Sequence, residues 1–234
     1  GYYITRNGSA VIAWRVPQHA IGGWRIAASH SDSPCWKIKA DMPENEGCRR
    51  LSVEGYGGMI MASWLDRPLT VGGRVLVKTQ DGVQSRLVYI DRDLLVIPSL
   101  AIHFQRDVNK GKVFNPQIDM QPLWGPAGSR TLTDLVCEEL GITAEEILDW
   151  DLQLVTRQAP VQIGPDNEYF MAPRIDDLEC AATTLLAFLE ASGEADSACA
   201  PVWAMFDNEE VGSSSRMGAE SSFLRDVLDR ILDA

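Results

Sequence analysis

Basic residues, long apolar runs and paired cysteines are scarce in this sequence, and each shortage excludes a class of protein. Lys and Arg together number 21 against 33 Asp and Glu, so the formal net charge is −12 at pH 7. Because phosphate binding needs clustered positive charge, we expect no nucleic acid as a partner. No apolar run approaches the ~20 residues that span a bilayer, so we expect no membrane partner. The first residues lack the basic head and apolar core of a secretory signal peptide.

The cysteines are few and scattered. Five are present, an odd number, and none of them forms a Cys-x-x-Cys pair. This pattern fits buried thiols in a reducing compartment better than a disulfide framework or a cysteine zinc site. Hydrophobic residues make up 45% of the sequence and charged residues 23%, which is ordinary for a globular protein. We therefore expect a cytoplasmic α/β protein.

Three blocks of sequence pattern follow one another along the chain. Residues 1–36 end in a nearly apolar segment at 24–29, which is typical of a buried strand. Residues 37–157 contain short strand-like pieces separated by Gly-Gly pairs and an Asp-Gly hairpin turn, then two expected helices. Residues 158–234 contain an apolar helical stripe and a second buried-strand signal. We predict an α/β domain in the outer blocks, interrupted by an inserted β-rich unit at 37–157.

Polar residues of metal-ligand type follow three of the predicted strands. The three pairs are His30 with Asp32, Asp176 with Asp177, and Glu209 with Glu210. In open α/β sheets the carboxyl ends of the strands form the binding crevice, so we expect these side chains to converge. One imidazole with several carboxylates suits a divalent ion such as zinc.

Each pair also has a purely structural explanation. Asp176 with Glu179 resembles a helix N-cap and capping box, and the two glutamates would be favoured near a helix N-terminus by its dipole. A single His after a strand is more often a hydrogen-bonded loop residue than a ligand. Acids at three strand ends would nevertheless repel one another unless a cation neutralised them. Metal binding is therefore the more economical interpretation.

Three segments resemble signature segments of the aspartyl aminopeptidase family of zinc metallopeptidases, to which vacuolar aminopeptidase I belongs. They occur in the family's order and read Ala-Ser-His-Ser-Asp-Ser-Pro at 28–34, Ala-Pro-Arg-Ile-Asp-Asp-Leu at 172–178 and Asp-Asn-Glu-Glu-Val-Gly-Ser at 207–213. The segments at 57–67 and 100–106 resemble further parts of the family, so the likeness spans nearly the whole chain. The resemblance implies a zinc-exopeptidase-like α/β/α catalytic domain (1–36 and 158–234) with a dimerisation domain inserted at 37–157.

The resemblance also implies a role for each site residue. His30 would bind one zinc ion, Asp176 would bridge two and Glu210 would ligate one of them. Asp32 would orient the His30 ring, and Glu209 would be the general base. The complete enzyme would hold two zinc ions per site, and manganese or cobalt would suit the same ligands.

Two implications of the resemblance reach beyond these ligands. His103 would bind substrate in a neighbouring subunit's active site, although strand alternation alone would turn it towards solvent. The family's ligand set also includes an Asp and a His farther along the chain, whereas the histidines here are His19, His30 and His103. We therefore expect a fragment that lacks the C-terminal part, from a homo-oligomer built from dimers.

The predicted function is metal-dependent removal of N-terminal residues, with acidic residues as one option, from peptide substrates. A related two-zinc exopeptidase of different specificity is one alternative, and activity on acidic versus leucine substrates would separate the two. A non-catalytic or incomplete fragment that acts only in assembly is the other alternative. A mass measurement that finds no second chain would favour that reading.

Overall fold

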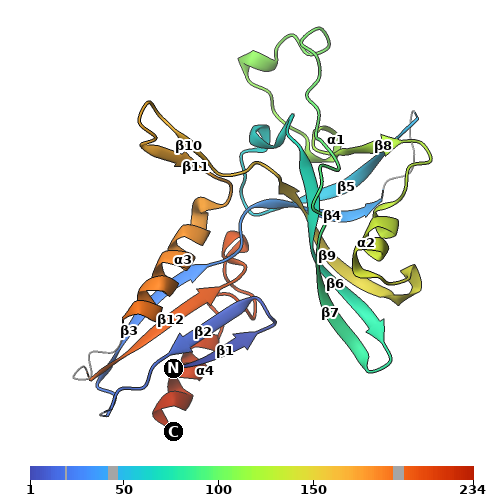
Figure 1. Cartoon of the computed structure of the whole chain (residues 1–234). Helices are drawn as coiled ribbons and strands as arrows, with labels where there is room; N and C mark the ends of the chain where they lie inside the picture. The colour runs from blue at the N-terminus through green and yellow to red at the C-terminus, as the bar shows by residue number, and fades with distance from the viewer. Residues whose placement is uncertain (19, 42–46, 192–197) are drawn as a thin grey trace. The chain divides into compact units, whose positions relative to one another are not determined.

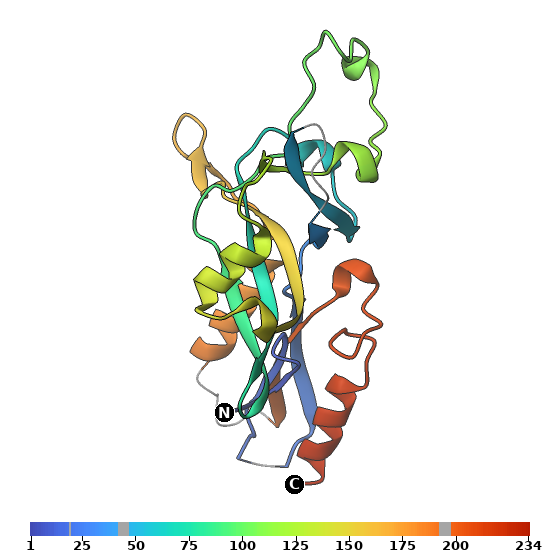
Figure 2. The same ribbon diagram turned by 90° about the vertical axis from the view of Figure 1, so that its right-hand side faces the viewer.

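The computed structural model describes residues 1–18, 20–41, 47–191 and 198–234. The chain divides into two compact units, which we call unit 1 (Gly1–Ser33 with Arg174–Ala234) and unit 2 (Pro34–Pro173). Figure 1 labels their elements, and Figure 2 shows the same ribbon turned by 90°. The α/β class predicted from the sequence is confirmed. The expected domain ranges, and the dimerisation role of the inserted part, stay predictions.

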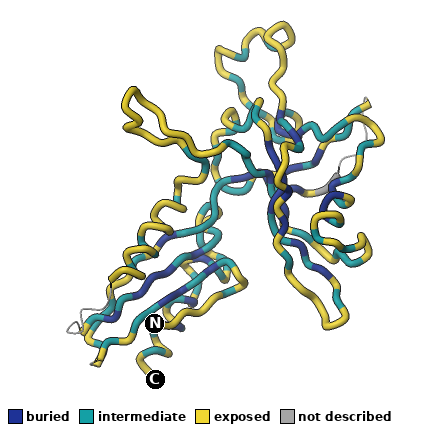
Figure 3. Tube along the Cα trace, viewed as in Figure 1, coloured by how far each residue is buried: buried dark blue, intermediate teal, exposed yellow. Residues whose placement is uncertain are grey.

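Unit 1 is built around a four-stranded sheet in the order β1-β2-β12-β3. Its strands are β1 (Tyr2–Arg6), β2 (Ala10–Trp14), β3 (Gly23–His30) and β12 (Cys199–Phe206). β12 pairs antiparallel with β2 and parallel with β3. The central strands β2 and β12 are the most buried of the four, as the dark blue tube in Figure 3 shows. Nearly continuous apolar residues are what a strand covered on both faces requires.

Two helices cover opposite faces of this sheet. They are α3 (Ile175–Glu190) and α4 (Phe223–Leu232). Successive side chains of a strand point to opposite faces. Trp203 of β12 donates its indole N–H to Thr184 of α3 at 3.0 Å, whereas its neighbour Val202 packs with Phe223 of α4. The alternation along β12 therefore gives unit 1 the expected α/β/α layering.

Unit 2 contains a six-stranded antiparallel sheet in the order β7-β6-β9-β4-β5-β8. Its strands are β4 (Cys35–Asp41), β5 (Cys48–Tyr56), β6 (Leu69–Thr79), β7 (Gly82–Tyr89), β8 (Leu123–Pro126) and β9 (Ile147–Thr156). Thr79 pairs with Gly82, so the predicted Asp81-Gly82 turn does close the β6–β7 hairpin. The largest fully buried side chains of this unit include Trp36, Leu51, Leu69, Ile97, Leu152 and Leu154.

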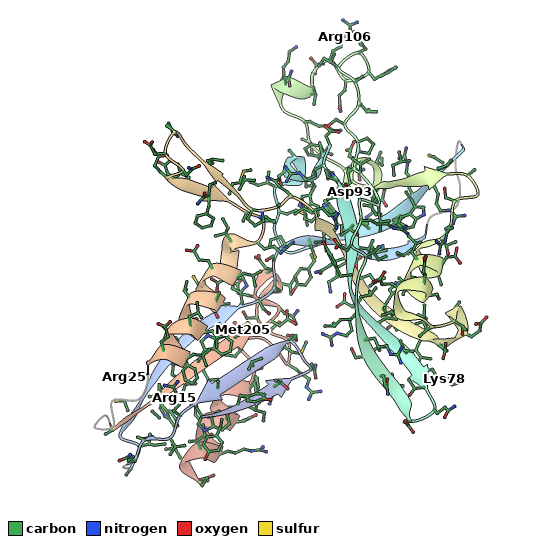
Figure 4. All side chains as sticks on the ribbon, viewed as in Figure 1. Arg15, Arg25, Lys78, Asp93, Arg106 and Met205 are labelled. Atoms are coloured by element: carbon green, nitrogen blue, oxygen red, sulfur yellow. The ribbon has the colours of Figure 1, made fainter. Side chains whose placement is uncertain are left out.

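Short elements complete the two units. Those of unit 2 are η1 (Met61–Trp64), η2 (Val108–Lys110), α1 (Pro116–Asp119), α2 (Leu132–Leu140), η3 (Ala144–Glu146), β10 (Val161–Ile163) and β11 (Tyr169–Met171). Unit 1 adds the 3-10 helix η4 (Glu209–Val211). The segment 98–115 of unit 2 is a long loop with Arg106 near its tip (Figure 4), and it also carries the exposed His103. No helix in the described part of the chain has the length and apolar character needed to cross a membrane.

Candidate metal centre

The candidate site lies at one edge of the unit 1 sheet, where β3 and β12 both end. These strands are parallel, and His30 at the end of β3 lies opposite Phe206 at the end of β12. Ser31 extends the pairing by donating its N–H to the Phe206 carbonyl at 3.0 Å. The chain beyond β12 then turns into η4, which carries Glu209 and Glu210. The residues that follow both strands therefore emerge at the edge that open α/β sheets use for ligands.

The carboxylate of Asp32 joins these two segments of chain. Its Oδ1 accepts the backbone N–H of Glu209 and its Oδ2 accepts that of Glu210, both at 3.1 Å. Nδ1 of His30 lies 3.0 Å from the Asp32 carbonyl oxygen and 3.3 Å from Oδ1 of the same residue. The Asp32 side chain is only 8% exposed, so these groups and little water surround its charge. Asp32 therefore orients the His30 ring and fixes the backbone of both glutamates.

Three of the predicted residues bring metal-ligand atoms together. One ligand atom each from His30, Glu209 and Glu210 lies within 4.8 Å of the other two, and the described residues contain one such group. Oδ1 of Asp176 lies 3.5 Å from Nε2 of His30, on a side chain that is 88% exposed. Nε2 also lies 3.9 Å from Oε2 of Glu209. Glu209, expected as the general base, is thus in the group of three, and Asp176, expected as a bridging ligand, lies beside His30 but outside that group. The roles of these residues stay predictions.

The charges at the site shift the pKa of two groups. Burial lowers the pKa of His30, but the carboxylates of Asp32 and Asp177 raise it by more, so it lies above the ordinary value of 6.5. Burial, with repulsion from the neighbouring Glu209 carboxylate, raises the pKa of Glu210. Both shifts report an excess of negative charge in a partly desolvated site.

This donor set fits a zinc ion. Zinc accepts imidazole nitrogen and carboxylate oxygen, which are the atoms that His30, Glu209 and Glu210 present. A zinc-binding imidazole is normally held through its second ring nitrogen by a carboxylate or a carbonyl, and Asp32 provides both at Nδ1 of His30. A cation would also relieve the repulsion that raises the pKa of Glu210.

Asp177 and Asn208 have contacts next to the site that the sequence did not predict. Asp177, expected only to lie among the converging acids, accepts the backbone N–H of His30 at Oδ2, at 3.1 Å. Asn208, which precedes Glu209, has a left-handed backbone (φ 63°), which Asn tolerates better than most residues, and its Oδ1 accepts a 2.6 Å hydrogen bond from the Ser215 hydroxyl. Neither hydrogen bond has a signal in the sequence, because an acid at a helix start and an Asn in a turn are both common.

The two other histidines lie elsewhere in the chain. His103 belongs to unit 2, so its predicted contact with a neighbouring subunit's site stays a prediction. His19 lies outside the described residues.

An imidazole and carboxylates at parallel strand ends of an α/β/α unit define the class as an α/β metal-binding protein. The sequence model of the Aminopeptidase I zinc metalloprotease (M18) family matches residues 1–234. The chain therefore belongs to the M18 family of zinc aminopeptidases, in agreement with the resemblance seen in the sequence.

Known proteins and structures agree with this membership. The probable M18 family aminopeptidase 2 of Clostridium acetobutylicum is 38% identical over 242 residues, which cover 99% of this chain and 55% of that protein. The cryo-EM structure of the Ape4 and Nbr1 complex matches with a TM-score of 0.91 and 35% identity, over 99% of this chain and 50% of that one. The S. cerevisiae mApe1 dodecamer matches with a TM-score of 0.78 and 27% identity, over 97% and 54%. The chain spans about half the length of these relatives.

Proposed function

We propose that this chain is part of a zinc-dependent aminopeptidase, which removes N-terminal residues from peptide substrates. The observation that carries the proposal is the group of His30, Glu209 and Glu210 at the parallel strand ends of unit 1. Membership of the M18 family supports zinc as the metal, and the same nitrogen and oxygen donors would suit manganese or cobalt. Peptides with acidic N-terminal residues are the first substrates to test.

The ligand roles are those that the family resemblance implies. His30 and Glu210 would hold one zinc ion, and Asp176 would bridge it to a second. The high exposure of the Asp176 side chain leaves its carboxylate accessible for such a bridge. The chain covers about half of its relatives, so further ligands of the second ion would come from the rest of the protein or from another chain.

Glu209 would transfer protons, and Asp32 would hold the site residues in orientation. A bound zinc ion would supply a Lewis acid that polarises the scissile carbonyl and lowers the pKa of a water molecule. Glu209 is half exposed, with Oε2 3.9 Å from Nε2 of His30, so it is accessible from solution and close to the ligands. Its carboxylate would take a proton from the attacking water and donate it to the leaving amine. Asp32 would hold the Glu209 backbone in place during both transfers.

The whole protein would work as a homo-oligomer built from dimers in the cytoplasm. The mApe1 relative forms a dodecamer. Unit 2 would be the dimerisation domain, and His103, exposed on the 98–115 loop, would reach substrate in a neighbouring subunit's site. None of the five cysteines, all of which lie in the described part of the chain, forms a disulfide, which suits a reducing compartment.

The proposal is tested by assaying the purified 234-residue chain on aspartyl, glutamyl and leucyl chromogenic amides, with added zinc or manganese and a chelator control. Turnover that the chelator abolishes and that Glu209→Gln lowers by about 100-fold or more, as loss of a general base does, would support the proposal. Glu220→Gln, at an exposed residue of the same unit, is the matched control and should keep wild-type turnover.

Zinc binding separates the remaining outcomes. If the chain binds zinc in a way that His30→Ala abolishes but shows no turnover, the chain alone is catalytically incomplete and acts within a larger assembly. If zinc binding is absent or insensitive to His30→Ala, the metal site proposed here is wrong. Preference for leucyl over acidic amides would indicate a related exopeptidase of different specificity.

A further inference from the structure

The two adjacent acids at the start of α3 face different surroundings. The side chain of Asp176 is 88% exposed, whereas that of Asp177 is 16% exposed. Oδ2 of Asp177 accepts the backbone N–H of His30 at 3.1 Å and lies 3.9 Å from Nε2 of the same residue. Asp177 is therefore turned into the protein against His30, on the side of the residue away from β12.

The topology of the sheet explains why His30 needs this contact. Among the described residues, β3 pairs with β12. Neighbouring residues of a strand direct their N–H groups to opposite sides, and Ser31 donates to Phe206 of β12. The N–H of His30 therefore points away from β12. Asp177 is the acceptor that this N–H finds there.

His30 is thus held from three directions. The parallel register with β12 fixes one edge of its backbone, Asp177 fixes the other edge, and Asp32 holds Nδ1 of the ring. Nε2 is left facing Asp176 and Glu209. A shift of the His30 backbone away from Asp177 would move Nε2 away from these carboxylates.

We propose that Asp177 is a positioning residue, which anchors the backbone of His30 on the side away from β12 so that Nε2 meets the other metal ligands. This inference rests on the proposed metal centre. It assigns Asp177 an acceptor role and not a ligand role, because the Oδ2 atom nearest to Nε2 already accepts the His30 N–H. The residue would act on metal affinity through His30.

The test uses the 234-residue chain with zinc as the probe, titrated in competition with a chelating dye. We expect Asp177→Ala to weaken zinc binding by about 10- to 100-fold, the usual cost of losing a residue that orients a metal ligand. Asp177→Asn keeps an acceptor oxygen for the His30 N–H without the charge, and should restore affinity close to wild type. Glu179→Ala removes one exposed acid from the same helix and is the matched control, with wild-type affinity expected.

Amide hydrogen exchange measured by NMR provides a second readout that needs no metal. The His30 amide should be protected in the wild-type chain and in Asp177→Asn, and should exchange faster in Asp177→Ala. An unprotected His30 amide in the wild-type chain overturns the proposal even if Asp177→Ala does not fold. Wild-type affinity in folded Asp177→Ala also overturns it. Equal weakening in the Asn and Ala variants would assign a charge or ligand role to Asp177 and contradict the acceptor role.

The two proposals can fail separately, and the experiments distinguish these cases. If wild-type zinc binding is insensitive to His30→Ala, the proposed function fails, and exchange at the His30 amide still decides whether Asp177 anchors the strand.

Discussion

Asp32 is the residue on which most of the site geometry depends, because its carboxylate contacts His30 and the backbone of both glutamates. Asp32→Ala removes the acceptor for two N–H groups and the partner of the imidazole. We expect zinc affinity to fall by about 10- to 100-fold, measured by isothermal titration calorimetry. Asp32→Asn keeps one acceptor oxygen and turns an NH2 group towards the other N–H. Its zinc affinity should therefore be nearly as low as that of Asp32→Ala.

The control for Asp32 is Asp81→Asn, which removes the same charge from an exposed turn of unit 2 and should bind zinc as the wild-type chain does. Wild-type zinc affinity in Asp32→Ala would show that the hydrogen bonds of Asp32 do not hold the ligands in place.

The raised pKa of His30 predicts opposite pH effects on folding and on zinc binding. In the metal-free chain the carboxylates of Asp32 and Asp177 stabilise the imidazolium, so the folded pKa lies above the unfolded value of 6.5. The stability that the His30 charge contributes is fully present below pH 6.5 and is lost as the pH rises through the folded pKa. Zinc needs the neutral imidazole, so zinc affinity should rise over the same interval.

NMR titration of the His30 ring measures this pKa directly, and denaturant unfolding of wild type against His30→Gln at several pH values measures the linked stability. A pKa at or below 6.5 in the metal-free chain would contradict the balance of charges described here. Asp32→Asn should lower the pKa of His30, because it removes one of the carboxylates that stabilise the charged ring.

At the scale of the elements, two adjacent glycines of β6 make a matched pair. Gly73 has φ +150°, and a Cβ atom there would lie 2.2 Å from the carbonyl oxygen of Asp151 in β9. A Cβ atom on Gly72 would come no closer than 3.3 Å, to a ring atom of Tyr89. Gly73→Ala must therefore push apart the β6–β9 pairing, whereas Gly72→Ala needs only a small side-chain movement.

We expect Gly73→Ala to lower the free energy of unfolding of unit 2 by ~3 kcal/mol and Gly72→Ala by less than ~1 kcal/mol. Urea denaturation followed by far-UV circular dichroism measures both values. Equal losses in the two variants would show that the backbone contact at Gly73 does not limit the sheet.

Two similar capping signals in the sequence gave two different elements, so the expected helix that would begin at Thr143 is wrong. Thr131 and Thr143 both form capping boxes, but the first begins the helix α2 and the second begins the three-residue η3. α2 continues because Leu132, Leu135 and Val136 are spaced to bury one helical face. After η3 the chain instead joins the sheet as β9, and this pairing with β6 decides the outcome over the local helix signal.

The site shows the same limit at finer detail. The sequence predicted that His30, Glu209 and Glu210 would meet, because the ends of two buried strands meet wherever those strands are parallel neighbours. It did not predict which of the adjacent acids Asp176 and Asp177 would turn inward. That choice depends on the backbone N–H of His30, which points away from β12 and donates to Asp177. It is a property of the assembled sheet and has no local pattern.

At the scale of the whole chain, the two units have separate apolar cores. The core of unit 1 is formed by residues of β2, β12 and α4, with Ile12 and Phe223 among its largest fully buried side chains. The core of unit 2 is formed around its six-stranded sheet and includes Leu152 and Leu154. Units with cores of their own can unfold in separate cooperative transitions. All the proposed metal ligands of this chain belong to unit 1.

Zinc should therefore stabilise unit 1 and not unit 2. A ligand that binds the native state alone adds about 2.7 kcal/mol to the free energy of unfolding when its concentration is 100 times its dissociation constant. Saturating zinc should therefore raise the unfolding temperature of unit 1 and leave that of unit 2 unchanged. The side chain of Leu154 is 1% exposed, so Leu154→Ala leaves a cavity in the core of unit 2. This substitution should lower the free energy of unfolding of unit 2 by ~2–5 kcal/mol and leave the transition of unit 1 unchanged. Differential scanning calorimetry of both chains, with and without zinc, gives four scans, and we expect two transitions in each. A single transition that zinc and Leu154→Ala both shift would mean that the two units unfold together, and that metal bound at His30 stabilises the whole chain.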